Sequence, residues 1–359
     1  MENTYGRNLK LKVTGASHAP KMTVELENFP CGFKIDIDEL NAFLQRRAPG
    51  KNAYSTQRKE PDAPIFISGV DNDFVTTGEK IVAEILNTSQ RSSDYNFNDT
   101  PRPSHADFCA VSKFGSDVDL KGGGKYSGRL TAMMCIAGGI CKQYLKSKGV
   151  DVFAHIYSIG NICDTPFDLK NVGLAELQKL QSAEFSTLDE NAAVCMKDLI
   201  EECRKNCDSI GGVIECAVTG LDVGLGDHMF NGVESRISSI VFEIPAIKGV
   251  EFGLGFGTAA LKGSQNNDAF CVENGKVRTS TNNCGGILGG MTNGMPLVFR
   301  GAVKPTPSIS IEQNTVSISK MENTKIQING RHDPCIVPRC VPVFEAAAAI
   351  AICDMMLDD

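Results

Sequence analysis

The sequence lacks the signatures of several common classes of site. None of its 14 cysteines forms a Cys-x-x-Cys pair, and its five histidines lie far apart without a His-Glu-x-x-His motif. These absences argue against a metal site, so we expect none. No Gly-x-Gly-x-x-Gly motif follows a strand in a βαβ unit, which argues against a Rossmann dinucleotide site. Tryptophan is also absent, but this excludes nothing by itself.

Charge and apolar runs exclude further classes of protein. The formal net charge is -7, so no general attraction to nucleic acid or to an anionic membrane is expected. No apolar run reaches the length that spans a membrane, and no cationic leader followed by an apolar run opens the sequence. We therefore expect a cytoplasmic protein with reduced, mostly buried thiols that binds neither nucleic acid nor membrane.

Helical and strand patterns alternate without a linker, a low-complexity tract or a clear repeat, which predicts a single domain over residues 1–359. Helices are predicted from Asp36 to Arg47, over 130–146, from a capping box at Thr187–Glu190 to about 207, over 229–241, and over 341–357, the last buried on all sides. Strands are predicted near 9–14, 63–69, 150–160, 213–219, 249–256 and 295–302; residues 81–86 fit a strand or a short helix. The pattern predicts an α/β (α+β) fold with sheets covered by helices.

The strongest local signal lies between Pro101 and Thr131. Gly122–Gly124 is flanked by lysines and opens the predicted central helix, where free backbone N–H groups can hold an anion. Upstream, Arg102 and His105 on a proline-stiffened loop offer an anion clamp and a proton donor near pH 7. The alternative is a surface turn with scattered charges.

Three other segments carry similar groups. Gly15–His18 follows a strand and exposes a hydroxyl and an imidazole, although such a histidine is more often structural. Arg46 and Arg47 end a helix, where cations also suit the helix dipole. Lys304–Ser308 offers a cation and two hydroxyls for a phosphate, or is a plain extended connector.

If these groups converge, they form a strongly cationic pocket with two histidines and a carboxylate as candidates for proton transfer. The residues concerned are Ser17, His18, Arg46, Arg47, Arg58, Arg102, His105, Arg129, Lys304, Arg331, Asp333 and Arg339. The residues themselves thus predict an enzyme that acts on a polyanionic small molecule.

Nearly the whole chain resembles the chorismate synthase family. The resemblance is carried by ten blocks in the family's order: Gly15–His18, Arg46–Gly50, Thr56–Asp62, Asn87–Ser92, Arg102–Asp107, Gly122–Gly124, Ile244–Glu251, Gly285–Gly290, Lys304–Ile309 and Gly330–Cys335.

The resemblance implies the family's reaction, a 1,4-trans elimination of phosphate from 5-enolpyruvylshikimate 3-phosphate that gives chorismate in the shikimate pathway of aromatic amino acid biosynthesis. It implies reduced FMN as cofactor without net redox change, a layered β-α-β-α sandwich with mostly antiparallel sheets, and a homotetramer. The chain lacks the added length of bifunctional members, so an external flavin reductase is expected as a partner. The alternative is a non-catalytic descendant that binds flavin or phosphate as a sensor or scaffold.

The resemblance also implies roles for individual residues. Catalytic roles fall to His18, His105 and Asp333. Cofactor binding falls to Lys125, Tyr126, Ser127, Pro245, Ala246, Gly289, Lys304, Pro305, Thr306, Pro307, Ser308 and Arg331. Substrate binding falls to Ser17, Arg46, Arg47, Arg58, Arg102, Arg129 and Arg339.

The chain departs from the family's pattern at positions that usually carry a positive charge. Ala48, Ala53 and Met134 stand where the family usually has arginine, and Lys125-Tyr126 replaces Arg-Ser. Lysine keeps the charge of arginine but loses its forked donor geometry. These departures bear on substrate affinity more than on the reaction, because both histidines and the aspartate are present.

Overall fold

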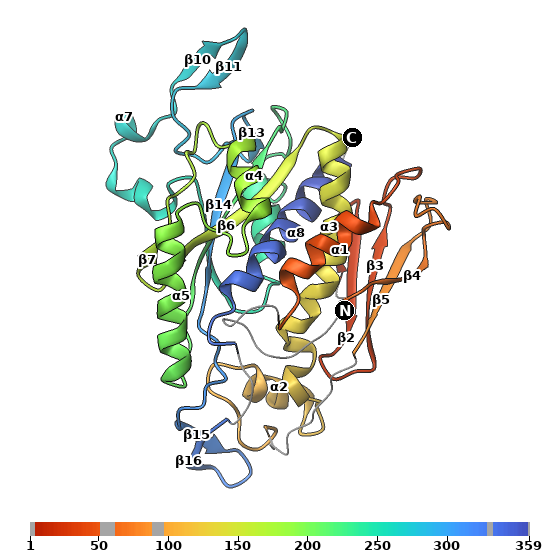
Figure 1. The fold of residues 1–359 in the computed structure, drawn as a ribbon, viewed down its shortest axis with the longest axis vertical. Helices are drawn as coiled ribbons and strands as arrows, with labels where there is room; N and C mark the ends of the chain where they lie inside the picture. The colour runs from red at the N-terminus through yellow and green to blue at the C-terminus, as the bar shows by residue number, and fades with distance from the viewer. Residues whose placement is uncertain (1–3, 51–61, 88–96, 329–332, 358–359) are drawn as a thin grey trace.

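The computed structural model describes residues 4–50, 62–87, 97–328 and 333–357. Figure 1 shows four stacked layers, sheet–helix–sheet–helix, as the resemblance implied. The first sheet has the strand order β1 (Thr4–Tyr5), β2 (Lys10–Gly15), β3 (Lys21–Glu27), β5 (Ile81–Leu86) and β4 (Ile65–Ser68). The second sheet has the strand order β7 (Ile162–Cys163), β6 (Asp151–Ile159), β8 (Gly212–Thr219), β14 (Leu297–Val303) and β9 (Ile247–Phe252). Every pairing in both sheets is antiparallel, so the fold is of the α+β class.

Three long helices lie between the sheets at the centre of the core. They are α1 (Ile37–Arg47), α3 (Thr131–Ser147) and α8 (Val337–Met356). The shorter α6 (Val233–Val241) packs against α8 beside them. Helices α3 and α8 touch closely at Gly138, where an added Cβ would lie 2.3 Å from the Cβ of Ala346. Helix α8 is buried along nearly its whole length, as its apolar composition predicted, and α4 (Leu174–Ser182) and α5 (Glu190–Lys205) cover the outer face of the second sheet.

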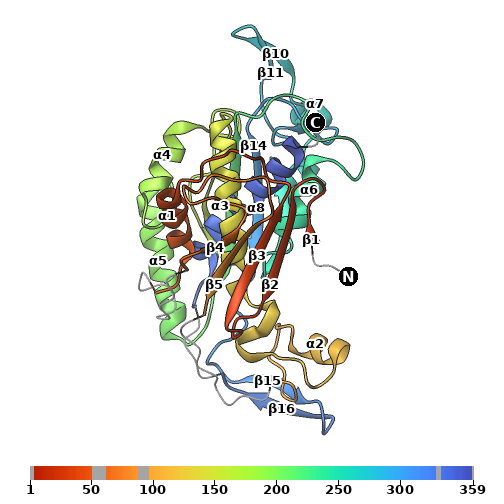
Figure 2. The same cartoon turned by 90° about the vertical axis from the view of Figure 1, so that its right-hand side faces the viewer.

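Smaller elements extend both ends of the molecule (Figures 1 and 2). The hairpin of β10 (Phe270–Glu273) and β11 (Lys276–Thr279) projects at one end, and β15 (Gln313–Ser317) and β16 (Glu322–Ile326) lie with α2 (Asp107–Phe114) at the other. The remaining elements are α7 (Gly263–Asn266), β12 (Ile287–Leu288), β13 (Met291–Thr292) and 3-10 turns at Lys121–Tyr126, Gly128–Leu130 and Gly255–Ala260. Within the described residues, no helix is both long and apolar enough to cross a membrane.

Several predicted boundaries are confirmed and others are wrong. The Asp36 side chain caps α1 by accepting from the Glu39 N–H, as predicted. The capping box at Thr187 is wrong, because Asp189 caps α5 instead. That helix ends at Lys205, since Cys207 takes a left-handed conformation with φ 58° and stops it. Residues 81–86 form a strand, and α6 begins at Val233, four residues later than predicted.

A row of charged side chains crosses the second sheet. Pairing places Glu251, Arg300, Glu215 and His155 side by side on β9, β14, β8 and β6. The imidazole of His155 is fully buried, with Nδ1 2.8 Å from the carboxylate of Asp164 and Nε2 2.9 Å from that of Glu215. Because a carboxylate only accepts hydrogen bonds, both ring nitrogens must carry hydrogen, and the imidazole is positively charged.

This arrangement predicts how stability depends on pH. Burial opposes the charge, but the hydrogen bonds to Asp164 and Glu215 outweigh it and raise the pKa of His155 above its ordinary value of 6.5. A raised folded pKa contributes stability that is complete below the unfolded pKa and is lost as pH rises through the folded value. The free energy of unfolding should therefore fall as pH rises above about 6.5, by an amount that His155→Gln removes. Urea unfolding across this range measures how the free energy of unfolding changes with pH in the wild type and in His155→Gln. Equal slopes in the two proteins would contradict the assignment.

Candidate active site

The glycine run between α2 and α3 has a backbone that only glycine adopts without strain. Gly122, Gly123 and Gly124 have φ values of 58°, 96° and 54°. An added Cβ on Gly122 would lie 1.9 Å from Cε1 of His18, and one on Gly123 would lie 3.4 Å from Nε2 of His105. Two histidines far apart in the sequence therefore border neighbouring glycines.

The turn after β2 and the glycine run form a first unit, held together by hydrogen bonds. The Ser17 N–H donates to the Gly124 carbonyl over 3.1 Å, and its hydroxyl donates to the Lys121 carbonyl over 3.0 Å. Nδ1 of His18 lies 3.0 Å from the same Lys121 oxygen. Because Nδ1 is the donor to a carbonyl, the Nε2 side of the ring is left for another partner.

The loop before α2 forms a second unit, in which one carboxylate organises two basic side chains. Asp107 is fully buried and accepts from Nε and Nη2 of Arg102, each over 2.7 Å. Its Oδ1 also lies 2.9 Å from Nδ1 of His105. Burial opposes ionisation, but the bonds to Arg102 and His105 outweigh it and hold the pKa of Asp107 well below its usual range. The Arg102 guanidinium also lies over the ring of Phe97, 4.0 Å from its centroid.

A third unit joins α1, α8, the 3-10 turn Gly128–Leu130 and two loops through alternating charges. Asp62 is buried and pairs with both Arg47 and Arg129. The Arg339 Nε donates to the Arg47 carbonyl over 3.1 Å, and its Nη1 donates to Asp333 over 2.6 Å. The unit contains three guanidinium groups and two carboxylates, so one positive charge is left over. Burial, followed by the neighbouring charge of Arg339, lowers the pKa of Arg47 to about 10, so Arg47 stays charged at neutral pH.

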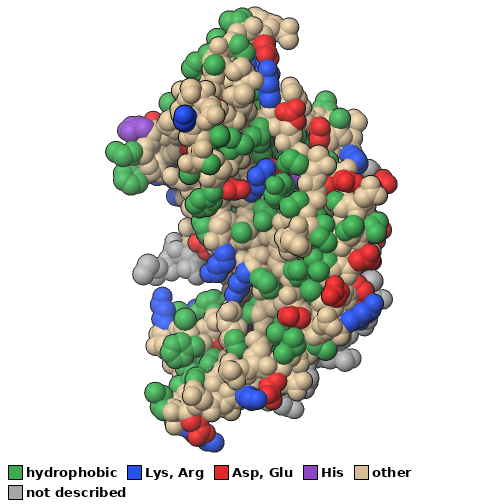
Figure 3. All heavy atoms as spheres, turned by 90° about the vertical axis from the view of Figure 1, so that its left-hand side faces the viewer, with side chains coloured by type: hydrophobic (Ala, Val, Ile, Leu, Met, Phe, Trp, Pro, Cys, Tyr) green, Lys and Arg blue, Asp and Glu red, His purple; other side chains and the backbone are tan. Residues whose placement is uncertain are grey.

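The segment after β14 reaches the same region. The Lys304 Nζ donates to the Ser104 carbonyl, and its backbone N–H donates to the Ala246 carbonyl over 2.9 Å. Burial and then the charge of Lys248 lower the pKa of Lys304. The buried hydroxyl of Thr306 has no hydrogen-bond partner within the described parts of the chain. A cation and, two residues further along the chain, an unpartnered buried hydroxyl are a fitting donor set for a phosphate. Figure 3 shows Lys and Arg side chains on both sides of a notch between the body of the molecule and its lower lobe.

The structure does not bring every predicted residue to this place. The guanidinium of Arg46 turns away from Arg47 and pairs with the buried Glu345 of α8, which Lys142 also contacts. Gly289 lies in the turn between β12 and β13, and Figure 1 places β13 at the opposite end of the molecule from α2. Arg58, Arg331 and Ala53 lie outside the described residues.

The substituted positions have definite surroundings. The Lys125 ammonium lies 3.9 Å from the centroid of the Phe114 ring. Tyr126 is partly buried against a small apolar cluster that includes Leu120 and Ile326. Ala48 and Met134 are both buried, and Ala48 borders a cavity of about 220 Å³ that Arg46 and Arg339 also line.

Sequence reasoning missed the residues that hold these groups in place. Asp62 and Asp107 each end a block of the sequence that contains an arginine, and this was the one sign in the sequence that they could pair with arginines. Asn87 was also missed: its amide donates to the Ala19 carbonyl over 2.7 Å and accepts from Nε of Arg129 over 3.3 Å. It thereby joins the turn that carries His18 to the third unit.

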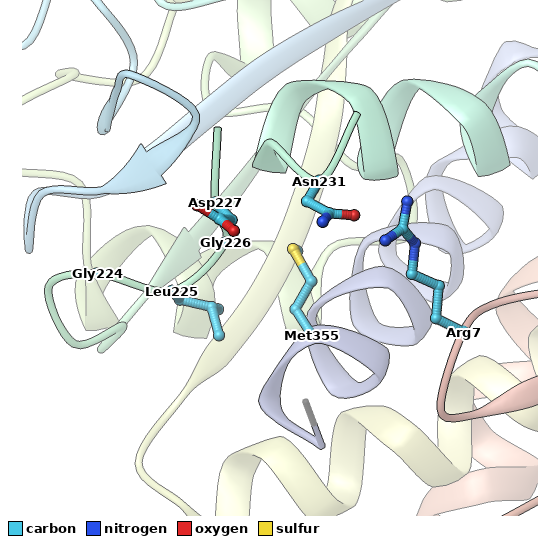
Figure 4. A pocket seen from close by; sticks show the side chains of 7 residues that line it. All are labelled: Arg7, Gly224, Leu225, Gly226, Asp227, Asn231 and Met355. Carbon is cyan, nitrogen blue, oxygen red and sulfur yellow. The ribbon is translucent and has the colours of Figure 1, made fainter. Parts of the chain in front are cut away.

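The cavity in Figure 4 is not part of this site. It measures about 370 Å³ and is lined by Arg7, Gly224, Leu225, Gly226, Asp227, Asn231 and Met355. Met355 lies near the C-terminal end of α8, whereas Arg339 lies near its start, and the 20 residues of this helix extend about 30 Å. Within the described ranges, no group of three or more His, Cys, Asp or Glu side chains could hold a metal ion.

Known proteins resemble this chain over nearly its full length. The profile of the family described as chorismate synthase matches residues 9–357. A chorismate synthase of Lancefieldella parvula is 42% identical over 99% of this chain and 96% of its own length. A chorismate synthase of Thermococcus kodakarensis is 42% identical over 98% of this chain and 97% of its own length. A solved structure described as the crystal structure of a chorismate synthase aligns with a TM-score of 0.76 at 27% identity, covering 98% of this chain and 93% of the other.

Proposed function

The chain belongs to the chorismate synthase family, and on that premise we propose that reduced FMN is its cofactor and that the three units around the glycine run form its active site. It is a carbon–oxygen lyase that eliminates phosphate from 5-enolpyruvylshikimate 3-phosphate to give chorismate. The observation that carries the site proposal is that His18 and His105 border neighbouring glycines of the run that leads to Arg129, which shares Asp62 with Arg47.

The charge of the units suits the substrate, which carries a phosphate and two carboxylates. Arg47 and Arg129 would bind substrate anions as a pair, because Asp62 holds both guanidinium groups in place. Arg102 would bind another from the facing loop. Since these side chains are buried and already oriented, they lose little freedom when the anions arrive.

The residues after β14 would hold the phosphate of FMN. Lys304 supplies the cation, while the unpartnered hydroxyl of Thr306 and the buried Ser308 supply donors. When bound, reduced FMN would lend and recover electron density, so that the elimination has no net redox change. His105 would hold a proton at Nε2 for the cofactor. His18 would lie beside the substrate phosphate, and Asp333 would assist removal of the C6 hydrogen.

Membership of the family also suggests how the chain assembles and how its cofactor is reduced. We expect a homotetramer, and exposed apolar side chains at Met229, Phe230, Phe256, Phe270 and Val277 offer contact surface. Light scattering would measure the mass, and a monomer would contradict the proposal. We also expect the chain to work in the cytoplasm with a separate flavin reductase.

An anaerobic assay tests this function. Purified protein with the enolpyruvyl substrate and dithionite-reduced FMN should release phosphate and form chorismate. The same protein with oxidised FMN and NADPH should form none, because the sequence contains no nicotinamide signature. Flavin binding without turnover under reducing conditions would favour the non-catalytic alternative, and turnover with NADPH alone would contradict dependence on a reductase.

A further inference from the structure

We propose that Asp107 is a positioning residue that fixes the tautomer of His105 and thereby determines which ring nitrogen exchanges a proton in the active site. The proposal rests on the proposed function of His105. Asp107 is linked to the glycine run through His105, whose ring borders Gly123.

The two carboxylate oxygens of Asp107 have different sets of partners. It begins α2, and both of its oxygens face back along the chain toward the preceding loop. The backbone N–H and Nε of Arg102 both donate to Oδ2, over 3.0 and 2.7 Å. Oδ1 accepts from Arg102 Nη2 over 2.7 Å and lies 2.9 Å from Nδ1 of His105.

Asp107 and Arg102 both approach Nδ1 of His105, and they favour opposite tautomers of the ring. An ionised carboxylate can only accept, so the 2.9 Å contact with Oδ1 of Asp107 favours a hydrogen on Nδ1 of His105. Arg102 Nη2 lies 3.2 Å from the same Nδ1 and can only donate, so a hydrogen bond from it would require the opposite tautomer, with Nδ1 as acceptor. We infer that Asp107 prevails, because its oxygen is nearer, at 2.9 Å, and an unprotonated nitrogen at that distance would repel an ionised carboxylate. Nε2 is therefore the nitrogen that gains and loses the proton, and it faces Gly123.

Replacing Asp107 by asparagine keeps the size of the side chain but removes the carboxylate that favours a hydrogen on Nδ1 of His105. If the amide oxygen takes the place of Oδ2, it keeps the bonds from the backbone N–H and Nε of Arg102. The amide N–H₂ then faces Nδ1 of His105 and makes it accept, and Nη2 of Arg102 loses its acceptor. The neutral ring then carries its hydrogen on Nε2 and cannot give it up without becoming an anion. If the amide turns round, its N–H₂ meets the backbone N–H and Nε of Arg102, and both of these hydrogen bonds are lost. Either arrangement impairs proton transfer from Nε2.

A double-mutant cycle tests the proposal. Asp107→Asn should lower kcat on the order of 10²-fold, the effect of losing a positioned acid. In the His105→Ala background, the same change should lower kcat by less than about threefold, because residues that act through one group are not additive. Asp354→Asn is the matched control, since Asp354 is a buried carboxylate paired with Arg236 near the far end of α8. It should lower stability and leave kcat unchanged.

Nitrogen-15 NMR of histidine-labelled protein without substrate gives a reading that does not depend on turnover. The His105 signals, identified by their loss in His105→Ala, should show a protonated Nδ1 in wild type and a protonated Nε2 in Asp107→Asn. The same tautomer in both proteins, or additive losses in the cycle, would overturn the proposal. An inactive wild type with the expected tautomers would instead overturn the proposed function and leave the positioning role standing.

Discussion

His105→Ala should lower kcat by on the order of 10²-fold or more, while KM changes much less. The imidazole is the group that we place at the cofactor, and Nε2 of His105 borders Gly123 directly. Substrate anions would be held by Arg47 and Arg129 through Asp62, which the change does not touch. Anaerobic turnover at saturating substrate, together with flavin binding, separates these effects.

A histidine elsewhere on the molecule provides the control for this change. His228 is largely exposed and pairs with Asp227 on the surface, so His228→Ala should keep wild-type kcat. If His105 only held its loop together, His105→Ala would lose thermal stability and activity in parallel. An unchanged melting temperature with full turnover would reject the catalytic assignment outright.

Glu345→Ala should lower the free energy of unfolding by about 3–5 kcal/mol, the cost of leaving buried charges without a partner. The Glu345 carboxylate lies in the centre of the helical layer and is 1% exposed. It accepts two hydrogen bonds from Arg46 of α1, over 2.6 and 2.9 Å, and pairs with Lys142 of α3. Removing it leaves two cations facing each other between three packed helices. Denaturant unfolding measures the loss.

The same carboxylate predicts part of the acid sensitivity of the wild type. Burial opposes ionisation of Glu345, but Arg46 and Lys142 outweigh it and lower its pKa to about 2. A depressed folded pKa contributes stability that is present above the unfolded value and is lost as pH falls toward the folded value. The wild type should lose this contribution below about pH 4.5, and Glu345→Ala should not. Glu201→Ala, which removes an exposed partner of Arg204, should change stability little; a loss equal to that of Glu345→Ala would contradict the argument.

Local patterns in the sequence predicted the elements whose cause is local. The helix over α3 followed from apolar residues at helical spacing, and the start of α1 followed from Asp36, whose own side chain caps it. Prediction failed where a neighbouring residue could serve the same purpose. Asp189 lies two residues after Thr187 and supplies the same kind of oxygen, and no rule of spacing chooses between them. Helix α2 was missed because its eight residues are too few for a clear periodic pattern.

The sequence by itself determined which chemistry this protein can carry out, through the family's blocks, the glycine run, the two histidines and the arginines within those blocks. Only the tertiary structure decided which charges meet. Arg46 and Arg47 are neighbours on one helical turn, yet Arg47 pairs with Asp62 and Arg46 with Glu345, 299 residues away. A turn of about 100° per residue sends adjacent side chains to different faces. Which face meets a carboxylate depends on how α1, α3 and α8 pack, and therefore on contacts between segments far apart in the chain.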